Sequence, residues 1–540
     1  MEIIEQHTQS FNLRDMVQKV GGQLAGDAGE HGITRSWGGW GFSFLINFNR
    51  RINEAVQNML VPMTDRLLFP NIVIKRVHYM SVDSTGKKPA KLSALLIIPD
   101  TKHGQPSMPI MGFQHGTIIN RSGAPSQFDP EEPLKTPEVI IGMLLAALNG
   151  YVVAMADYQG LGDDTVNIQP YVSAEPLAQS VVDLLLETKN YMAQQPLNRH
   201  NGEIYLTGYS QGGYVTMAVA KAIGDNPDLM EQLPVKAAAP CAGPYSLSEA
   251  MRFLMLREEK FVEGGHFILM AIRGFNATYG DDFDNGIFTK EGALLPEYSI
   301  LWDLADGNHT AEEVHQHMPA IPRHCLSPRL LEALSNPQSP AFKILAQNDL
   351  VDINPQMPMQ LYHSPSDDMV PYQNSQIAYQ HISEVKPTIA LSPCFYIPLG
   401  TIVHVEAAVP CLFTAYAWLN TYRTLEKQDL MPGEFIHGGQ NLFTHDKAYC
   451  LRYQLDGELV FYDMADISVK FKAEVKATEH DTGKCIMQPE DGNLVIYDAS
   501  DEPTWASNTN RHPGASLNIT QKGQLTINDA KGRVVLELAP

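Results

Sequence analysis

Short runs of apolar and β-branched residues alternate with stretches of helical spacing between residues 71 and 423. Two of the helical stretches are Pro137–Leu148 and Leu177–Met192. The apolar runs are bounded by Gly, Pro, Asp or Ser, as strands usually are, and cover residues 71–77, 92–98, 110–114, 151–156, 204–207, 235–239, 359–362 and 394–398. The first two runs flank a Gly-Lys-Lys-Pro turn and predict an antiparallel pair. The later alternation predicts βαβ units, and hence an α/β fold with a doubly wound, mostly parallel sheet and helices on both faces.

Two segments with a different residue composition lie before and inside this alternation. Residues 1–65 are mixed and polar, and we interpret them as an amino-terminal extension packed on an α/β domain of residues 66–424. Residues 245–345 are rich in Met, Leu, Phe and other aromatic residues, and 267–272 is their most apolar piece. This composition predicts a helical insertion above the sheet.

The sequence pattern changes again after Arg423, where short strand-like runs follow glycines. The run Gly457–Asp463 recurs as Gly492–Asp498 and, more weakly, as Gly523–Asp529. The starts of the three copies are 35 and 31 residues apart. Three repeated β units are therefore expected, in a separate carboxy-terminal domain of residues 428–540.

The charge of the 540-residue chain counts against broad nucleic-acid binding. Its 39 Lys and Arg residues face 61 Asp and Glu residues, a net charge of −22, and no basic cluster stands out. Six cysteines without a Cys-x-x-Cys pair predict neither a zinc ribbon nor a dense disulfide framework. The sequence contains no Gly-x-Gly-x-x-Gly after a strand, no phosphate loop and no His-Glu-x-x-His, so we expect no cofactor and no metal.

The first residues lack the basic and apolar regions of a secretory signal, and no apolar run reaches the roughly 18 residues that a spanning helix needs. We therefore expect a soluble protein without a transmembrane segment. Its location is cytoplasmic by default, or the protein is exported by a route without a cleavable signal peptide.

The sharpest chemical signal is Gly208-Tyr209-Ser210-Gln211-Gly212. It lies between strand-like residues 203–207 and helix-like residues 214–223. A Gly-x-Ser-x-Gly in that position is typical of the nucleophile elbow, a strained turn that lifts the serine hydroxyl above the sheet edge. The five residues alone would be common by chance, and the strand and helix around them favour Ser210 as a nucleophile over an ordinary turn.

A serine nucleophile needs a base, and in this fold the order along the chain is Ser, acid, His. Asp367 and Asp368 lie in an acidic turn after the strand-like run that ends at residue 362, and His404 follows the run at 394–398 and precedes a helix. We predict Asp367 as the acid and His404 as the base. The two aspartates could instead be solvated turn or cap residues and His404 a helix cap, but their order, strand-end positions and spacing favour catalytic roles.

Two donors should hold the oxyanion of a tetrahedral intermediate. One is the backbone N–H of Gln211, directly after the nucleophile. The other is expected in the loop His115-Gly116-Thr117 after the strand-like run 110–114, where glycine allows close approach and Thr117 presents its N–H. A purely structural glycine turn is the alternative, and we interpret His115 as a loop-shaping residue rather than a second base.

These motifs resemble those of α/β-hydrolases of the secretory lipase (lipase A-like) group and its bacterial esterase relatives. The matching segments lie at residues 114–117, 156–162, 208–213, 242–245 and 367–371. The resemblance spans about residues 70–422 and implies an α/β-hydrolase fold that cleaves acyl esters, with a helical cap at 245–345 that shapes the acyl pocket. Chain-length preference does not transfer, because the cap is the part that matches least.

The tail resembles the bulb-type mannose-binding lectins, whose repeated site reads Gln-x-Asp-x-Asn-x-Val-x-Tyr. The resemblance implies a β-prism II fold and mannose-type glycans as partners. Glu458 replaces the Asn of the first copy, Pro489 stands at the Gln position of the second, and the third has lost its polar set. The turn at 505–509 matches the family's core-tryptophan turn and supports the fold. The candidate carbohydrate-binding residues are Gln454, Asp456, Tyr462, Asp491, Asn493 and Tyr497.

The first functional hypothesis is a serine hydrolase, a lipase or esterase, that cleaves carboxylic esters through Ser210, Asp367 and His404 and is targeted by a lectin-like domain. One alternative is a glycan-binding protein whose hydrolase domain is an idle scaffold. Another is an enzyme that deacetylates acylated glycans. The complete set of candidate catalytic residues favours an enzyme, but the sequence does not choose between a lipid and an acylated sugar as substrate.

Overall fold

The structure is a computed structural model that describes residues 3–13, 71–99, 108–194, 200–260, 264–386, 388–394, 402–423, 429–437, 440–444, 448–454, 457–476 and 482–540. The strands of its large sheet are β1 Ile4–Asn12, β2 Asn71–Val82, β3 Pro89–Pro99, β4 Met108–Gln114, β5 Val152–Ala156, β6 His200–Tyr209, β7 Val235–Cys241, β8 Gln360–His363 and β9 Ala390–Pro393. Their order is β1-β2-β3-β5-β4-β6-β7-β8-β9. In this order, neighbouring strands from β1 to β5 pair antiparallel, and neighbouring strands from β5 through β4 and β6 to β9 pair parallel. The predicted antiparallel pair and the mostly parallel sheet are confirmed.

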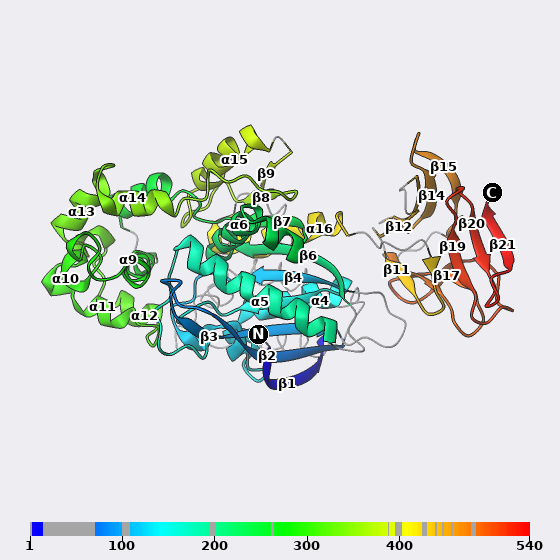
Figure 1. The fold of residues 1–540 in the computed structure, drawn as a ribbon, viewed down its shortest axis with the longest axis horizontal. Helices are drawn as coiled ribbons and strands as arrows, with labels where there is room; N and C mark the ends of the chain where they lie inside the picture. The colour runs from blue at the N-terminus through cyan, green and yellow to red at the C-terminus, as the bar shows by residue number, and fades with distance from the viewer. Residues whose placement is uncertain are drawn as a thin grey trace, which may run out of the picture.

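Helices cover both faces of this sheet. Their bounds are α4 Pro137–Asn149, α5 Ala174–Gln194, α6 Gln211–Gly224, α7 Pro227–Gln232, α15 Gln373–Val385 and α16 His404–Asn420. Side chains of β3 alternate between two cores: Leu92 and Leu96 pack in the core that contains α5 and α6, and Leu95 and Ile97 pack in the core that contains α4 and α16. The two-residue period of a strand produces this division. Helices α5 and α6 cross the near face of the sheet in Figure 1.

The predicted insertion between β7 and β8 is helical, and its helices gather at one end of the molecule (Figure 1). It contains the π-helix η4 Leu247–Met251, and the α-helices α8 Arg252–Leu256, α9 Gly265–Tyr279, α10 Lys290–Ala293, α11 Ile300–Leu304, α12 Ala311–His315, α13 Pro328–Ser335 and α14 Pro340–Gln347. Short 3₁₀ turns are η1 Arg121–Gly123, η2 Pro125–Gln127, η3 Pro133–Lys135, η5 Phe283–Asn285, η6 Pro296–Tyr298 and η7 Pro322–Cys325. We call residues 245–345 the cap.

Three antiparallel four-stranded sheets form the carboxy-terminal part. The first consists of β12 Asn441–Phe443, β13 Tyr449–Tyr453, β14 Leu459–Asp463 and β15 Ser468–Lys472. The second consists of β11 Phe435–His437, β16 Thr482–Met487, β17 Leu494–Asp498 and β18 Pro503–Ala506. The third consists of β10 Asp429–Leu430, β19 Ser516–Ile519, β20 Leu525–Asn528 and β21 Val534–Ala539. Each predicted repeat contributes one strand, β14, β17 or β20, to a different sheet. A hydrophobic core made only of residues after 429 joins the three sheets, which confirms three β units.

The structure differs from the sequence interpretation at three places. Residues 4–12, assigned to an extension, form strand β1 of the large sheet, while residues 14–65 lie outside the described part. The sequence did not predict strand β9, Ala390–Pro393, and the expected run at 394–398 lies outside the described residues except for Cys394. This strand ends in proline, which an edge position tolerates because no neighbour needs its missing N–H. Helix α16 begins at His404 instead of after it.

Candidate active site

Ser210 lies at the sharp turn between β6 and α6. Its backbone angles are φ 59° and ψ −122°, a combination that non-glycine residues adopt rarely and that marks functional turns. A Cβ atom at Gly208 would lie 2.5 Å from the carbonyl oxygen of Gln114, and one at Gly212 would lie 2.0 Å from the same oxygen. The elbow therefore needs glycine at both positions, because the turn packs directly against β4.

A chain of hydrogen bonds joins the three predicted catalytic residues. The Nε2 atom of His404 lies 2.8 Å from the Oγ of Ser210, and its Nδ1 lies 2.5 Å from the Oδ2 of Asp367. Ser210 comes from the β6–α6 turn, Asp367 from the loop after β8, and His404 from the first residue of α16. The Asp367 side chain is fully buried, and that of His404 is 6% exposed. The structure brings together residues that lie up to 194 positions apart.

The loop after β8 holds the carboxylate of Asp367 on both oxygens. Oδ1 accepts the backbone N–H groups of Met369 at 3.0 Å and Val370 at 2.7 Å. Oδ2 contacts Nε2 of His363 at 3.1 Å as well as His404. Burial alone would raise the pKa of Asp367, but the two histidines and their hydrogen bonds hold this pKa below its usual range. Asp367 is therefore an ionised acceptor for His404.

Asp368 has a different environment from its neighbour. It is exposed, and its Oδ1 accepts the backbone N–H of His404 at 3.1 Å. His404 is the first residue of α16, where backbone N–H groups have no partner within the helix. Asp368 thus caps the helix that carries the histidine, without a recorded bond to the imidazole.

Further contacts fix the start of α16. The ring of Tyr209 lies 5.0 Å from the imidazole of His404, and its hydroxyl donates to the carbonyl oxygen of His404. A disulfide joins Cys394, just after β9, to Cys411 in α16, and the other four cysteines are buried and free. The sequence predicted at most sparse bridging and could not predict this pair.

The predicted oxyanion loop passes beside the elbow. A Cβ placed on Gly116 would lie 3.9 Å from the Cβ of Ser210. The N–H of Gly116 donates to both carboxylate oxygens of Glu138, at 2.9 and 3.1 Å, so it is engaged. Thr117 is held through its hydroxyl, 3.0 Å from that of Tyr171. Gln211 is the first residue of α6, so its backbone N–H is one of the first-turn groups that have no acceptor within the helix.

His115 shapes this loop from inside the protein. Its ring is fully buried and stacks on Tyr158 with the centroids 4.1 Å apart. Its two nitrogens lie 2.7 Å from the carbonyl oxygen of Gly116 and 3.2 Å from that of Asp157. Burial lowers its pKa to about 4, so the imidazole is neutral at physiological pH.

Glu138 is an acidic residue near the elbow that the sequence did not single out. It occupies the first turn of α4 and is partly exposed. Burial raises its pKa from 4.5 to about 7, although the hydrogen bond from Gly116 acts in the opposite direction. No local motif marks it, because only the fold places α4 behind the loop 115–117.

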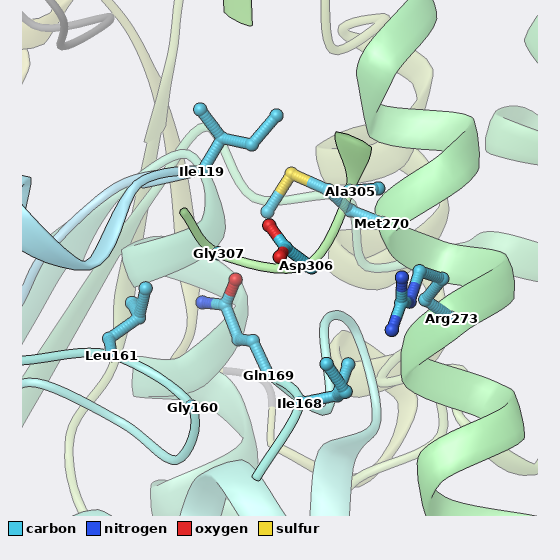
Figure 2. A pocket seen from close by; sticks show the side chains of 10 residues that line it. All are labelled: Ile119, Gly160, Leu161, Ile168, Gln169, Met270, Arg273, Ala305, Asp306 and Gly307. Atoms are coloured by element: carbon cyan, nitrogen blue, oxygen red, sulfur yellow. The ribbon is translucent and has the colours of Figure 1, made fainter. Parts of the chain in front are cut away.

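The cap is tied to the loops beside the site. The backbone N–H of Arg121 donates to the carbonyl oxygen of Gly307 at 2.8 Å, and the Tyr171 ring stacks on Phe267 of α9. Figure 2 shows a small cavity between the cap and these loops, with the amide of Gln169 pointing into it and with Arg273 of α9 at its edge. The cavity volume is about 20 Å³, which suits roughly one water molecule rather than an acyl chain.

In the carboxy-terminal part, the structure revises the alignment of the second repeat. The amide of Gln454 donates to the hydroxyl of Tyr462 at 3.4 Å, and the amide of Gln488 donates to the hydroxyl of Tyr497 at 2.9 Å. The backbone N–H of Gln488 also bonds the carbonyl of Asn493, as that of Gln454 bonds Glu458. Gln488, and not Pro489, therefore corresponds to Gln454, and the second loop is one residue longer. An alignment without a gap missed this glutamine.

Other candidate sugar-binding residues already have partners inside the tail. Asn493 Oδ1 accepts from the hydroxyl of Ser507 at 3.0 Å and from the N–H of Thr509 at 3.2 Å. Asp491 Oδ1 accepts the N–H of Asn493 at 3.0 Å. Asp456 lies outside the described residues.

None of the helices in the described residues combines the length and the apolar composition of a membrane-spanning segment. Within the same part of the chain, no group of three or more His, Cys, Asp or Glu side chains is placed to hold a metal ion.

No protein-family model and no curated protein matches the chain. Solved structures do resemble it. A protein of Legionella pneumophila described as a hydrolase is 21% identical, with a TM-score of 0.61 over 79% of this chain and 98% of that one. The rice cell wall degrading esterase LipA of Xanthomonas oryzae is 23% identical, with a TM-score of 0.56 over 68% and 92%. Candida antarctica lipase A in its closed state is 19% identical, with a TM-score of 0.50 over 64% and 78%. At these identities the likeness establishes architecture alone: the chain has the α/β fold of hydrolases.

Proposed function

We propose that the chain is a serine hydrolase that cleaves carboxylic esters through Ser210, His404 and Asp367. The observation that carries the proposal is the continuous hydrogen-bond chain from the Ser210 hydroxyl through both nitrogens of His404 to a buried, ionised carboxylate. A neutral serine is a weak nucleophile, and this arrangement supplies the base and the group that orients the base.

In the acylation step, the Oγ of Ser210 attacks the ester carbonyl while Nε2 of His404 takes the hydroxyl proton. Asp367 holds Nδ1–H and stabilises the imidazolium that forms. The same proton then passes from Nε2 to the oxygen of the leaving alcohol, and an acyl-enzyme remains on Ser210. Water repeats the sequence against the acyl-enzyme, with His404 again as base, and releases the carboxylic acid.

The oxyanion of each tetrahedral intermediate is assigned to the N–H groups of Gln211 and Thr117. Support comes from the start of α6 at Gln211 and from the engagement of Gly116 N–H by Glu138, which leaves Thr117 as the donor on this loop. Donors fixed before the reaction stabilise charge that develops during it, and each contributes about 10²- to 10³-fold to the rate.

The substrate class is a carboxylic ester of a lipid or of an acylated sugar. The cap is tied to the oxyanion loop through Tyr171 and Phe267, so it is the element expected to shape the acyl pocket. The name of the Xanthomonas oryzae relative, a cell wall degrading esterase, makes esters carried by polysaccharides a class to test beside lipids.

The tail is proposed as a lectin-like targeting module of the β-prism II type. Support comes from its three four-stranded sheets and from the two glutamine–tyrosine pairs, Gln454–Tyr462 and Gln488–Tyr497. Full-length protein applied to an array of mannose-type glycans tests this role. Gln488→Ala should weaken any binding more than Lys522→Ala, and absence of binding at millimolar glycan would refute the targeting role while leaving the hydrolase untouched.

The experiment on the hydrolase uses a fluorophosphonate probe and p-nitrophenyl esters of graded chain length. Ser210→Ala should abolish labelling and reduce hydrolysis to a residual rate of roughly 10³ over water, with the fold retained. Ser335→Ala removes an exposed serine of α13 and should change neither readout. Equal labelling of wild type and Ser210→Ala would place the nucleophile elsewhere.

A further inference from the structure

A second histidine contacts the carboxylate of Asp367. His363 ends β8, four residues before Asp367, and its side chain is fully buried. Its Nε2 lies 3.1 Å from Asp367 Oδ2 and 2.9 Å from the carbonyl oxygen of Val370. Its Nδ1 lies 2.7 Å from the hydroxyl of Ser375 in α15.

These partners determine which ring nitrogen of His363 carries a proton. A carbonyl oxygen and an ionised carboxylate only accept hydrogen bonds, so Nε2 must be the donor to both. The hydroxyl of Ser375 can donate, so it suits an unprotonated Nδ1. His363 is therefore held in the tautomer that presents Nε2–H to Asp367.

The same carboxylate oxygen serves both imidazoles. Oδ2 of Asp367 accepts from Nε2 of His363 and from Nδ1 of His404, while Oδ1 is occupied by two backbone N–H groups. A carboxylate with both oxygens held from several directions cannot rotate away from His404. The hydrogen bond from His363 also reduces the negative charge on the Asp367 carboxylate that stabilises a protonated His404.

We propose that His363 is a positioning residue for ester hydrolysis: its Nε2–H fixes the orientation and the basicity of Asp367, and through Asp367 the orientation of His404. The inference rests on the proposed function of Ser210, His404 and Asp367. In the described structure, the hydrogen bonds of His363 go to Asp367, Val370 and Ser375 and not to Ser210, so it acts on the nucleophile through the shared oxygen of Asp367.

Other titratable groups surround this pair of imidazoles. Tyr372, at the start of α15, meets the His363 ring edge-on at 5.4 Å, and Tyr209 of β6 lies against His404. Asp368 contacts the backbone of His404 from the acid loop. A change in the pH profile is therefore assigned to His363 only when two variants of that one position differ.

The test compares His363→Gln with His363→Asn. A glutamine amide reaches the place of Nε2 and can donate to Asp367, whereas an asparagine amide reaches only the place of Nδ1, beside Ser375. On a soluble p-nitrophenyl ester, His363→Asn should lower kcat by about 10- to 100-fold with KM nearly unchanged, the usual cost of losing a group that orients a functional residue. His363→Gln should recover most of kcat. The acid limb of the kcat/KM profile should move to higher pH in His363→Asn, because His404 then faces a carboxylate with more of its charge.

Ser375→Ala removes the partner of Nδ1 and leaves the bond from Nε2 to Asp367. Its kcat should fall less, and its acid limb should shift less, than in His363→Asn, even where its thermal midpoint falls. The proposal is overturned if the Gln and Asn variants have the same kcat and pH profile, or if kcat falls in Ser375→Ala as far as in His363→Asn. Failure of the proposed function has a different signature, in which Ser210→Ala still hydrolyses ester and still reacts with fluorophosphonate.

Discussion

Replacing Glu138 by Gln should change how the stability of the protein depends on pH. Burial raises the pKa of Glu138 from 4.5 to about 7 in the folded protein. A raised pKa means that its contribution to stability is complete below the unfolded value of 4.5 and is lost as pH rises through about 7. Glutamine can still accept the N–H of Gly116 and does not titrate, so the variant isolates this one ionisation.

The size of the effect follows from that shift. The pKa changes from 4.5 to about 7, a difference of about 2.5, and each unit of pKa corresponds to roughly 1.4 kcal/mol, so about 3.5 kcal/mol is an upper bound. Glu138 is partly exposed, and solvent screens such interactions. We therefore expect wild type to lose about 1–2 kcal/mol relative to Glu138→Gln between pH 4.5 and pH 8.

The assay is the midpoint of thermal unfolding, measured for wild type and variant at half-unit steps from pH 4.5 to pH 8.5. The difference between the two proteins removes the contributions of all other titrating groups. Glu175→Gln is the matched control, because Glu175 also lies in the first turn of a helix, α5, but is exposed. It should show a constant offset. Parallel curves for wild type and Glu138→Gln would refute the account of Glu138 as an acid with a raised pKa beside the loop 115–117.

Three further predictions concern the acid turn, the tail and the disulfide. Asp367→Asn should lower kcat by about 10⁴-fold, because it changes the acceptor of the His404 ring. Asp368→Asn should lower kcat less than about 10-fold, because Asp368 bonds only the backbone of His404 in the described structure. Equal effects of the two variants in steady-state kinetics would contradict the assignment. A protein ending at residue 424 should stay folded and hydrolyse a soluble short-chain ester at the wild-type rate, because the core of the tail is separate; an insoluble or inactive product would contradict this. Cys411→Ser should lower the free energy of unfolding by about 3 kcal/mol, because it removes the disulfide that closes a loop between two positions 17 residues apart. That loop contains His404. A denaturant titration that shows no loss would refute the idea that this disulfide stabilises the connection between β9 and α16.

Much of the hydrolase architecture could be predicted because its signals are local. Central strands such as Val152–Ala156 are buried on both faces and read as continuous apolar runs, and the elbow needs glycines at fixed positions. Strand β9 was missed because Ala390–Pro393 lies at the edge of the described sheet and is only partly buried, so it carries a weak apolar signal. The chain order Ser, acid, His then led to three residues that the fold brings within hydrogen-bond distance.

The supporting residues of the site had no such signal. Glu138 reaches Gly116 only because α4 packs behind the loop after β4, and His363 reaches Asp367 only because the loop after β8 turns back on its own strand. Gln488 was missed for another reason, a single inserted residue that shifts the repeat by one. Tertiary contacts and loop insertions are the two kinds of information that periodicity and ungapped repeats do not contain.

The acid turn shows how two identical side chains come to separate roles. In the sequence, Asp367 and Asp368 are adjacent carboxylates that follow the same strand, and their type alone does not distinguish them. In the structure, the N–H of Asp367 bonds the carbonyl of Ser364 at 3.2 Å, and this turn sends the first carboxylate inward and leaves the second exposed. The inward carboxylate meets N–H groups of the loop and both imidazoles, so it stays charged although it is buried. The outer carboxylate meets the start of α16 and fixes the backbone that carries His404. Because the two contacts act on the same histidine, one on its ring and one on its backbone, the pair of aspartates orients His404 more firmly than either could alone.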